Sequence, residues 1–582
     1  MENYKNFDVA GYVWAYYLDR ADEAEMQHGI DFYKQYLPLD KVYLENHRGL
    51  VDVPKAKMIR AKNFFEKNGI KTAGGITSTG FVGERKPSIY DTFCYTDPRH
   101  REYYLSIVKE IAEVFDEIIL DDYFFTACRC EMCIKAKGNQ TWSEYRTKLM
   151  ADFSKEIVSL AKSINPEIKF VVKFPNWYES FLENGYSPEI QKNIFDGVYT
   201  GTETRDSRIT TQHLQRYLSY GVLRLMENTA PGQNGGGWID KYGSEKNLNE
   251  FLEQGQLTLL AKAKELSLFN FEHLTDSLMI PPLGKQLVET DKLLGELGNP
   301  IGVSVYEPYT GAGEEQLFSY LGMGGIPMEP VPYFDGKAPV VFLSERTTED
   351  EQIVDHLKKY VQSGGNAVIT TGFLRKTLNK GIGDMTTLRP TGRHASGTQF
   401  LIGNYNYTSS SMAEGKHAIQ FEVLEYKNNA SWSDITLIAD ECNFPILSED
   451  AYGQGRLFVL NVPDNFADFY KLPAAVWEGL AKHLSMGQRV YMGSGAKYNL
   501  FAYDNNRYVL RSYQPVVTTC SVIVRGACEG IQNLSTGEMI TNKKELPRPG
   551  HRMDCCAHID EPFEDAYEIV VPAGGEVVFQ VL

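Results

Sequence analysis

A cadence that recurs along residues 8–274 constrains the fold more than any other feature of the chain. An apolar, β-rich run ends in a polar or aromatic residue and is followed by a stretch with apolar positions at helical spacing. The runs are DVAGYVWAYY, KVYLENH, IKTAGGIT, EIILDDYFF, IKFVVKF, FDGVYTGTE, VLRLMEN and LSLFNFEH. Eight such strand–helix units in this length of chain predict one (β/α)₈ barrel, the TIM-barrel fold.

The chain is too long for the barrel alone. Its 582 residues exceed what one core holds, because single cores stop growing near ~250–300 residues. We expect the barrel over residues 1–296, an α/β domain of the flavodoxin-like or amidotransferase-like kind over 297–490, and a small antiparallel β-sandwich over 491–582. The α/β prediction comes from the runs PIGVSVYE, PVVFLSE and NAVITTG and the glycine-capped helix DEQIVDHLKKYVQSGG. The sandwich prediction comes from RYVLRSY, CSVIVRGA, YEIVVPAGG and EVVFQVL.

Charge and composition exclude several classes of partner. The formal charge of −17 would repel phosphate backbones, so nucleic acid is not an expected partner. No stretch reaches the ~18 apolar residues of a membrane span, and the N-terminal MENYKNFDVAGYVW lacks the pattern of a signal peptide. We expect a soluble, cytoplasmic protein, or a periplasmic or secreted one if a leader was removed. No GxGxxG joins a strand to a helix, and no cysteine sits on a strand-to-helix elbow, so we expect no organic cofactor and no amidotransferase chemistry.

Four of the nine cysteines are spaced for a metal site. Cys128, Cys130 and Cys133 form the run CRCEMC, and the strand–helix connection would bring Cys94 back beside them. Four thiolates suit a closed tetrahedral zinc site, which is structural because catalytic sites keep a water position. The alternative is four unrelated reduced cysteines. The other five show no such spacing, although Cys555 and Cys556 adjoin His558.

Polar residues at the predicted strand ends should converge on one pocket, because the active site of a TIM barrel lies at the carboxyl ends of its strands. They are Glu45, Arg48, Asp121, Asp122, Lys173, Glu203, Arg205, Glu227, Glu272 and His273. Each has a structural alternative, such as a helix cap or an ion pair. The indole rings of Trp14, Trp177 and Trp238 are suited to stack on sugar faces, or simply to pack in the core.

The chain resembles the family 42 β-galactosidases over most of its length, and three stretches, which together make up a few dozen residues, carry the resemblance. One runs through FCYTDPRHREYY, LDDYF and CRCEMC; the second is LRLMENTAPGQNGGGW; and the third is YGQGRLFVLNVPDN, which is similar to the closing strand of that family's trimerisation domain. The resemblance implies a divergent relative of this family and a homotrimer. It aligns Glu227 with the nucleophile, Asp122 with the acid/base and Asp121 with the asparagine that precedes it.

The chemistry expected from this resemblance is glycoside hydrolysis by two carboxyl groups. Asp122 would donate the proton, aided by the like charge of Asp121, and Glu227 would attack; Glu203 is the rival nucleophile, unless Arg205 neutralises it. Adjacent strand residues alternate sides, so only one of the two aspartates should face the pocket; Asp122 is the first choice for the acid and Asp121 is the alternative. We expect an exo-acting, retaining enzyme that removes terminal sugars, β-galactosides or related ones. The alternatives are an inverting glycosidase of different sugar specificity and a non-catalytic carbohydrate-binding protein on a decayed barrel.

Overall fold

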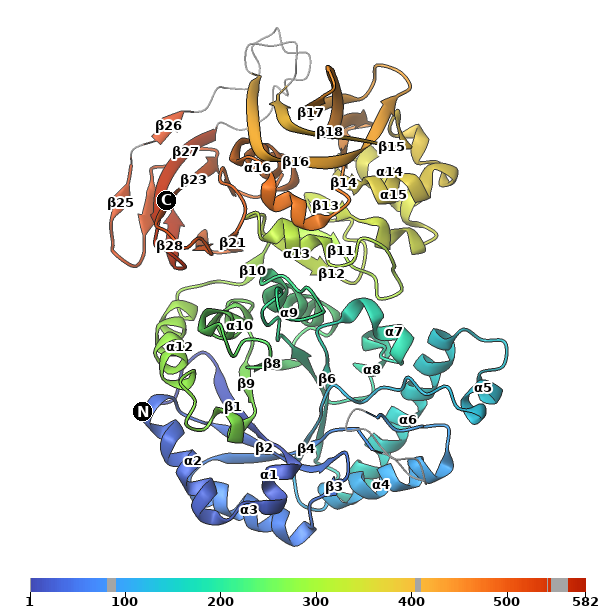
Figure 1. Cartoon of the computed structure of the whole chain (residues 1–582), viewed down its shortest axis with the longest axis vertical. Coiled ribbons are helices and arrows are strands. Elements are labelled where there is room, and N and C mark those ends of the chain that lie inside the picture. The colour runs from blue at the N-terminus through green and yellow to red at the C-terminus, as the bar shows by residue number, and fades with distance from the viewer. Residues whose placement is uncertain (1, 81–90, 404–409, 542, 546–563) are drawn as a thin grey trace. The chain divides into compact units, whose positions relative to one another are not determined.

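The computed structural model describes residues 2–80, 91–403, 410–541, 543–545 and 564–582. The chain divides into two compact units, residues 1–296 and 297–582 (Figure 1). Within the described residues, no helix combines the length and the apolar character that crossing a membrane requires.

The first unit is a closed barrel of eight parallel strands, as predicted. The sheet closes because β1 pairs with both β2 and β9, and helices surround it (Figure 1). The strands are β1 (Asp8–Val13), β2 (Lys41–Arg48), β4 (Lys71–Ile76), β5 (Glu117–Leu120), β6 (Lys169–Phe174), β7 (Gly197–Gly201), β8 (Asn234–Asp240) and β9 (Glu265–Phe269). The short β3 (Val51–Asp52) only forms a hairpin with β2.

Side chains from every barrel strand fill the interior. The buried cluster takes at least one inward residue from each strand: Ala10, Tyr12, Tyr43, Ala73, Ile119, Val171, Tyr199, Trp238 and Phe269. A barrel packed in this way is a core and not a pore, so ligands are confined to its ends.

The longer helices of this unit carry clear start signals. Asp22 and Glu25 form a capping box at α2, and Thr141 and Glu144 form one at α6. Asp97 caps α4, whose first residue is Pro98. The main helices are α2 (Glu23–Tyr36), α3 (Lys55–Lys67), α4 (Pro98–Ala112), α6 (Trp142–Ile164), α9 (Tyr217–Thr229), α10 (Leu248–Leu260) and α12 (Ile280–Leu294).

One predicted barrel strand is wrong. VLRLMEN lies inside α9, and the seventh strand of the barrel is β8, with the sequence NGGGWID. Short apolar runs do not distinguish a buried strand from a buried helix. Close packing explains the glycines of β8, because a side chain would not fit there. A Cβ on Gly236 would lie 2.1 Å from the Glu265 carbonyl oxygen, and one on Gly237 would lie 2.2 Å from the Thr258 side chain. Glycine lowers strand propensity, which hides this strand in the sequence.

The second unit contains a mixed sheet and a sandwich. The mixed sheet begins with five parallel strands in the order β12 (Met328–Val331), β11 (Val303–Tyr306), β13 (Val340–Leu343), β14 (Asn366–Thr370) and β19 (Gly455–Leu460). The sheet then continues with antiparallel strands that the sequence patterns do not separate: β18 (Cys442–Tyr452), β17 (Trp432–Ala439), β15 (Leu388–Ile402) and β16 (Ser411–Tyr426). Its helices include α13 (Leu317–Gly322), α14 (Ile353–Gln362), α15 (Thr371–Thr377) and α16 (Ala474–Leu484).

The C-terminal β domain has the antiparallel pairing that its alternating runs predict. One sheet has the order β10 (Pro300–Ile301), β21 (Tyr498–Tyr503), β22 (Arg507–Ser512), β28 (Glu576–Val581), β24 (Ile531–Asn533) and β25 (Met539–Ile540). The other has β20 (Val490–Met492), β23 (Thr518–Arg525), β27 (Glu564–Val571) and β26 (Lys543–Glu545). Side chains from both sheets share one buried core.

Candidate active site

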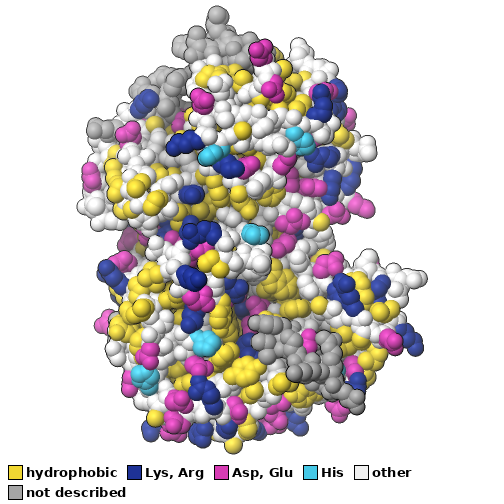
Figure 2. Space-filling view, viewed as in Figure 1, with side chains coloured by type: hydrophobic (Ala, Val, Ile, Leu, Met, Phe, Trp, Pro, Cys, Tyr) yellow, Lys and Arg dark blue, Asp and Glu magenta, His cyan; other side chains and the backbone are white. Residues whose placement is uncertain are grey.

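A pocket of about 640 Å³ opens at the carboxyl ends of the barrel strands. Figure 2 shows a hollow in the face of this unit, where charged side chains of both signs adjoin hydrophobic ones. Most predicted site residues line the pocket, together with several that were not predicted: Trp14, Tyr16, Arg48, Asp121, Asp122, Tyr123, Phe125, Lys173, Asn176, Trp177, Glu203, Arg205, Gln212, Trp238, Asp240, Tyr242 and Phe269.

Lys173, near the end of β6, is the centre of the charge network. Its Nζ lies 2.9 Å from Asp122 Oδ2, 3.4 Å from Asp121 Oδ1 and 3.5 Å from Glu203 Oε1. The ammonium also lies 4.1 Å from the centre of the Trp238 ring. Only 2% of the Lys173 side chain is exposed. One buried cation therefore holds three carboxylates together.

The two aspartates after β5 have opposite electrostatic environments. Burial alone would raise the pKa of Asp121, but Lys173 and Arg48 lower it to about 2. Asp121 Oδ2 also accepts hydrogen bonds from Arg48 at 3.0 Å and from the Thr77 hydroxyl at 2.9 Å. Burial raises the pKa of Asp122 to about 7, and the charges of Asp121 and Glu203 act in the same direction against Lys173. At neutral pH, one aspartate is ionised and the other is poised to carry a proton.

Both aspartates line the pocket, which corrects the prediction that only one would. The strict alternation of side chains holds inside a strand. Strand β5 ends at Leu120, so Asp121 and Asp122 belong to the connection beyond it. In addition, Asp121 Oδ1 accepts the backbone N–H of Asp122 at 2.8 Å, which fixes the two residues relative to each other.

Glu203 comes from the loop after β7. It is 4% exposed, and Asn176 donates a hydrogen bond to its backbone oxygen at 2.7 Å. Its Oε2 is buried and has no hydrogen-bond partner among the described residues. A buried carboxylate oxygen without a donor is costly unless a ligand or water satisfies it. Glu203 thus has one buried carboxylate oxygen to which no described residue donates a hydrogen bond.

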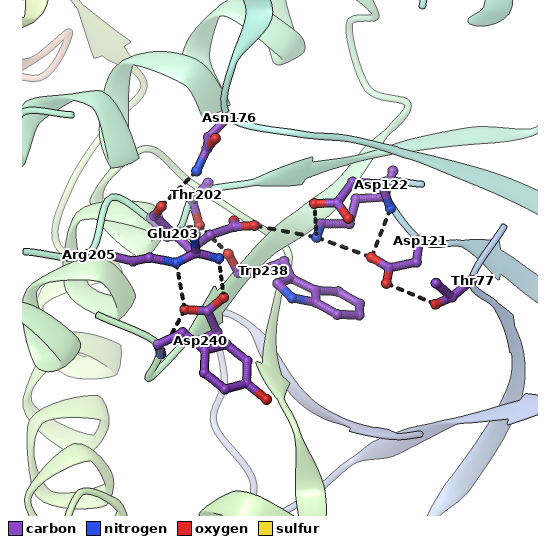
Figure 3. Close-up of polar contacts among 12 residues, drawn as sticks. Thr77, Asp121, Asp122, Asn176, Thr202, Glu203, Arg205, Trp238 and Asp240 are labelled. Carbon is purple, nitrogen blue, oxygen red and sulfur yellow. Dashed lines mark hydrogen bonds and ion pairs between the residues drawn. The ribbon is translucent and has the colours of Figure 1, made fainter. Parts of the chain in front are cut away.

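Arg205 and Asp240 form a separate ion pair in the lining of the same pocket. The Arg205 Nε and Nη2 atoms donate to the two Asp240 oxygens at 3.0 and 2.6 Å (Figure 3). Burial raises the pKa of Asp240 to about 6, against the lowering effect of Arg205. Because both oxygens of Asp240 are engaged, Arg205 neutralises Asp240 and not Glu203, the partner that proximity in the sequence suggests.

Two predicted substrate-binding residues support the pocket from behind. Glu45 is 0% exposed and accepts hydrogen bonds from Tyr12, the Ala15 backbone and Arg48, so it orients Arg48. Glu272 Oε2 accepts the indole N–H of Trp14 at 2.7 Å. Neither glutamate lines the pocket. His273 also stays behind the lining, where its Nδ1 lies 3.1 Å from the Tyr242 hydroxyl.

The predicted nucleophile Glu227 lies outside the pocket. It is near the end of α9, where its Oε1 accepts the backbone N–H of Gly232 at 2.8 Å. The strand-end prediction for Glu227 depends on the run VLRLMEN, which is helical. The carboxylate that ends the true seventh strand is Asp240, which sequence reasoning missed. In the sequence, two apolar residues directly before Asp240, in the run WID, indicate a strand. The three glycines that precede them have low strand propensity and concealed it.

The four predicted metal ligands lie together. The Sγ atoms of the four cysteines all lie within 4.8 Å of one another: Cys94, Cys128, Cys130 and Cys133. The Sγ atom of Cys94 is 3.7 Å from that of Cys130 and 3.5 Å from that of Cys133. Ligands ~2.3 Å from a tetrahedral zinc ion would be about 3.8 Å apart. The cluster can therefore hold a metal ion such as zinc. Cys555 and Cys556 lie outside the described residues.

Family models match all three parts of the chain. Residues 1–284 match the model described as "Probable glycosyl hydrolase, catalytic domain", and residues 489–566 match "Probable glycosyl hydrolase, C-terminal domain". Residues 298–465 match "Uncharacterized protein SSO3021, second domain". A relative from Saccharolobus solfataricus, "Uncharacterized protein SSO3021", is 25% identical over 526 residues, which cover 80% of this chain and 84% of the relative.

Solved structures share the fold at low sequence identity. The β-galactosidase from Bacillus circulans sp. alkalophilus aligns over 100% of this chain and 99% of its own, with a TM-score of 0.64 and 12% identity. The exo-β-1,4-mannosidase Op5Man5 from Opitutaceae bacterium strain TAV5 aligns over 78% of this chain and 92% of its own, with a TM-score of 0.52 and 9% identity. The predicted architecture of the family 42 β-galactosidases is confirmed, and the chain is glycosyl-hydrolase-like.

Proposed function

We propose that this glycosyl-hydrolase-like barrel hydrolyses glycosidic bonds, with Asp122 as proton donor and Glu203 as the ionised carboxylate. The observation that carries the proposal is that both side chains meet at the same buried cation, Lys173, inside the pocket. Glycoside cleavage requires one protonated and one ionised carboxyl group at the scissile bond. This assignment keeps the acid that the resemblance implies and replaces Glu227.

The electrostatic environment supports the role of Asp122. A catalytic acid works best when its pKa lies near the operating pH, and burial raises the pKa of Asp122 to about 7. Asp121 stays ionised, and we assign it the task of maintaining the charge that keeps Asp122 protonated. The cation of Lys173 orients both reacting carboxyl groups.

The geometry is compatible with retention of configuration, which the resemblance implies. Asp122 Oδ2 and Glu203 Oε1 lie 2.9 and 3.5 Å from the same Lys173 nitrogen, so they are at most 6.4 Å apart, the sum of these distances. Retaining enzymes have carboxyl separations of ~5–5.5 Å and inverting ones ~6.5–9.5 Å. This bound, taken between the two nearest oxygens, allows the separation of a retaining enzyme. We therefore propose that the Glu203 carboxylate attacks the anomeric carbon and that Asp122 protonates the leaving oxygen.

The substrate class follows from the lining and from similar proteins. The rings of Trp14, Trp177 and Tyr242 offer faces for stacking against a sugar. With Asp122 protonated, three carboxylates balance the three cations Arg48, Lys173 and Arg205, which suits a neutral sugar. A β-galactosidase and an exo-mannosidase share the fold. We propose exo-acting removal of terminal, neutral, galactoside-like or related sugars.

The first experiment screens the purified protein against aryl α- and β-glycosides of neutral sugars. On a substrate that is hydrolysed, Glu203→Gln should lower kcat at least ~10³-fold, because the attacking group is lost. Asp122→Asn should lower turnover of a 4-nitrophenyl glycoside far more than that of a 2,4-dinitrophenyl glycoside, whose leaving group needs no proton. Azide should rescue Glu203→Gln and give a glycosyl azide of inverted configuration.

Two variants serve as matched controls. Glu227→Gln should retain full turnover, because that carboxylate caps a helix end away from the pocket. Asp240→Asn should retain more activity than Glu203→Gln, because Asp240 acts through Arg205. If Asp240→Asn were the variant that azide rescues, Asp240 and not Glu203 would be the nucleophile. Sugar binding without any turnover would instead support the non-catalytic alternative.

We also propose that the four-cysteine cluster binds one structural zinc ion. Zinc would tie the connection after β5, which carries Cys128, Cys130 and Cys133, to Cys94 in the segment before α4. Metal analysis of the purified protein should find one zinc per chain. Cys133→Ser should lose it and unfold at a lower temperature, whereas Cys442→Ser, an exposed cysteine outside the cluster, should do neither. Full zinc content in Cys133→Ser would contradict the assignment.

The homotrimer that the resemblance implies is a separate proposal. Light scattering of the purified protein should give three times the chain mass of 65.8 kDa. A monomer mass at all concentrations would contradict it.

A further inference from the structure

A second crevice, in the α/β domain, carries side chains that the proposed hydrolysis does not use. It has a volume of about 580 Å³, within the ~300–1,000 Å³ range of small-molecule sites. We call it the α14 crevice. It is lined by Tyr306, Pro332, Tyr333, Phe334, Gly336, Asp350, His356, Lys359, Tyr360 and Ser363.

The crevice lies where ligands bind to open α/β sheets. Strand β11 has β12 on one side and β13 on the other, so the winding direction of the sheet reverses at β11. Ligands bind beside such a reversal, outside the carboxyl ends of the strands. Tyr306 ends β11, and Pro332–Phe334 directly follow β12. The lining therefore comes from the carboxyl edge of this sheet and from the adjacent helix α14.

Helix α14 presents one polar face to the crevice. His356, Lys359 and Ser363 follow helical spacing, and the opposite face of the helix packs into the domain core through Ile353, Leu357 and Val361. His356 stacks on Phe334, with ring centres 5.9 Å apart, and its Nδ1 is buried without a hydrogen-bond partner among the described residues. A buried ring nitrogen without a partner is uncommon, and an ordered water or a ligand in the crevice can supply the missing hydrogen bond.

The charges select against phosphorylated ligands. The N-terminus of α14 would favour an anion by its helix dipole, but the acidic residues Glu349, Asp350 and Glu351 precede it. Asp350 lines the crevice, and the Tyr306 hydroxyl lies 3.4 Å from its Oδ2. A nucleotide or a sugar phosphate would meet these like charges. Hydroxyl groups, in contrast, can donate to Asp350 and accept from Lys359.

The aromatic side chains complete the chemistry of a sugar site. Tyr333, which lines the crevice, is 52% exposed, whereas Phe334 and Tyr360 pack edge to face against each other in the lining, with ring centres 5.6 Å apart. An exposed ring beside a carboxylate, an ammonium and an imidazole matches the apolar face and the hydroxyl rim of a pyranose. We propose that the α14 crevice is a second saccharide site, which binds a neutral sugar of a glycan independently of the barrel pocket.

Affinity electrophoresis of the full chain in gels that contain β-galactan, galactomannan or arabinan tests this proposal. The native protein should be retarded in at least one gel. Tyr333→Ala and Asp350→Ala should weaken the retardation at least ~10-fold in apparent Kd, because stacking and hydroxyl contacts are lost. Tyr333→Phe keeps the ring and should bind like the native protein. Tyr426→Ala removes another exposed tyrosine of the same domain, outside the crevice, and is the matched control.

The outcomes separate the crevice from the barrel. Glu203→Gln should keep the retardation, and Tyr333→Ala should keep the native kcat on a small aryl glycoside. Retardation that survives in both crevice variants, or no retardation in any of the gels, overturns the crevice proposal but leaves hydrolysis intact. Retardation that depends on Tyr333 in a protein without glycosidase activity overturns the proposed hydrolysis alone. A change of oligomer mass in Tyr333→Ala would identify the crevice as an interface between copies and overturn the saccharide site.

Discussion

The barrel and the α/β domain both carry charged side chains at the carboxyl ends of parallel strands, but they use them differently. In the barrel, Lys173 and its carboxylates line a pocket of about 640 Å³. In the α/β domain, Glu307 follows β11 and pairs with Arg346 after β13 at 3.2 Å, and both side chains are essentially unexposed. Charges at this edge form a site only where they line a cavity; elsewhere they act as a structural ion pair.

The largest expected effect distinguishes the two regions by stability. Arg346→Met should lower the free energy of unfolding by about 3–5 kcal/mol, because it removes the cation that pairs with the buried Glu307 carboxylate. Denaturant titration followed by circular dichroism measures this loss, and kcat of the remaining folded protein should be unchanged. The double variant Arg346→Met with Glu307→Gln should recover part of the loss. An unaltered denaturation midpoint in Arg346→Met would mean that the Glu307–Arg346 ion pair is not structural, and the contrast with the barrel charges would not hold.

The second largest effect is expected in the barrel, where loss of the buried cation should reduce activity more than stability. Lys173→Met should lower kcat about 10²–10³-fold, as loss of one preorganised charge partner does, because Asp122 and Glu203 lose the cation that orients them. Its unfolding midpoint should change less than that of Arg346→Met, since water can enter the pocket and Asp122 can take up a proton. Steady-state kinetics and the same denaturant titration measure both quantities. A stability loss as large as that of Arg346→Met would mean that Lys173 is structural as well.

The smallest effect concerns the pH profile. In the native protein, kcat/KM should fall as pH rises above about 7, because the acid Asp122 loses its proton. Asp121→Asn removes a negative charge that raises the pKa of Asp122, so the fall should begin at lower pH. Lys173→Met removes a positive charge that lowers this pKa, so the fall should begin at higher pH. If the fall of kcat/KM at high pH shifted in the same direction in both variants, Asp122 would be excluded as the titrating group.

Local patterns are sufficient for features that depend on neighbours along the chain. Seven of the eight predicted strands are correct because each is an apolar run that ends in polar residues, as EIILDD and IKFVVK do. The carboxyl edge of such strands leads to Asp121, Asp122 and Lys173 without further information. The spacing of Cys128, Cys130 and Cys133 likewise indicates a metal-ligand cluster, and the fold gathers their sulfurs as that spacing predicts.

Other features depend on packing between distant segments. Whether VLRLMEN or NGGGWID is the seventh strand depends on the close approach of β9, where the Glu265 carbonyl leaves no room for a Cβ on Gly236. That contact exists only once the barrel closes, so the sequence pattern favours Glu227 and misses Asp240. Partner choice is of the same kind, since Arg205 is near Glu203 in sequence but binds Asp240 in space.

The amino-acid sequence by itself thus determined the barrel, the domain that follows it, the four cysteines and the acidic pair at the end of β5. These features follow from hydrophobic periodicity and short-range spacing, which the chain carries locally. Only the tertiary structure decided which carboxylates contact Lys173 and which of the predicted residues lie outside the pocket. Burial and charge pairing are set by segments that meet across the barrel, and their distances are not encoded in any single stretch of the chain.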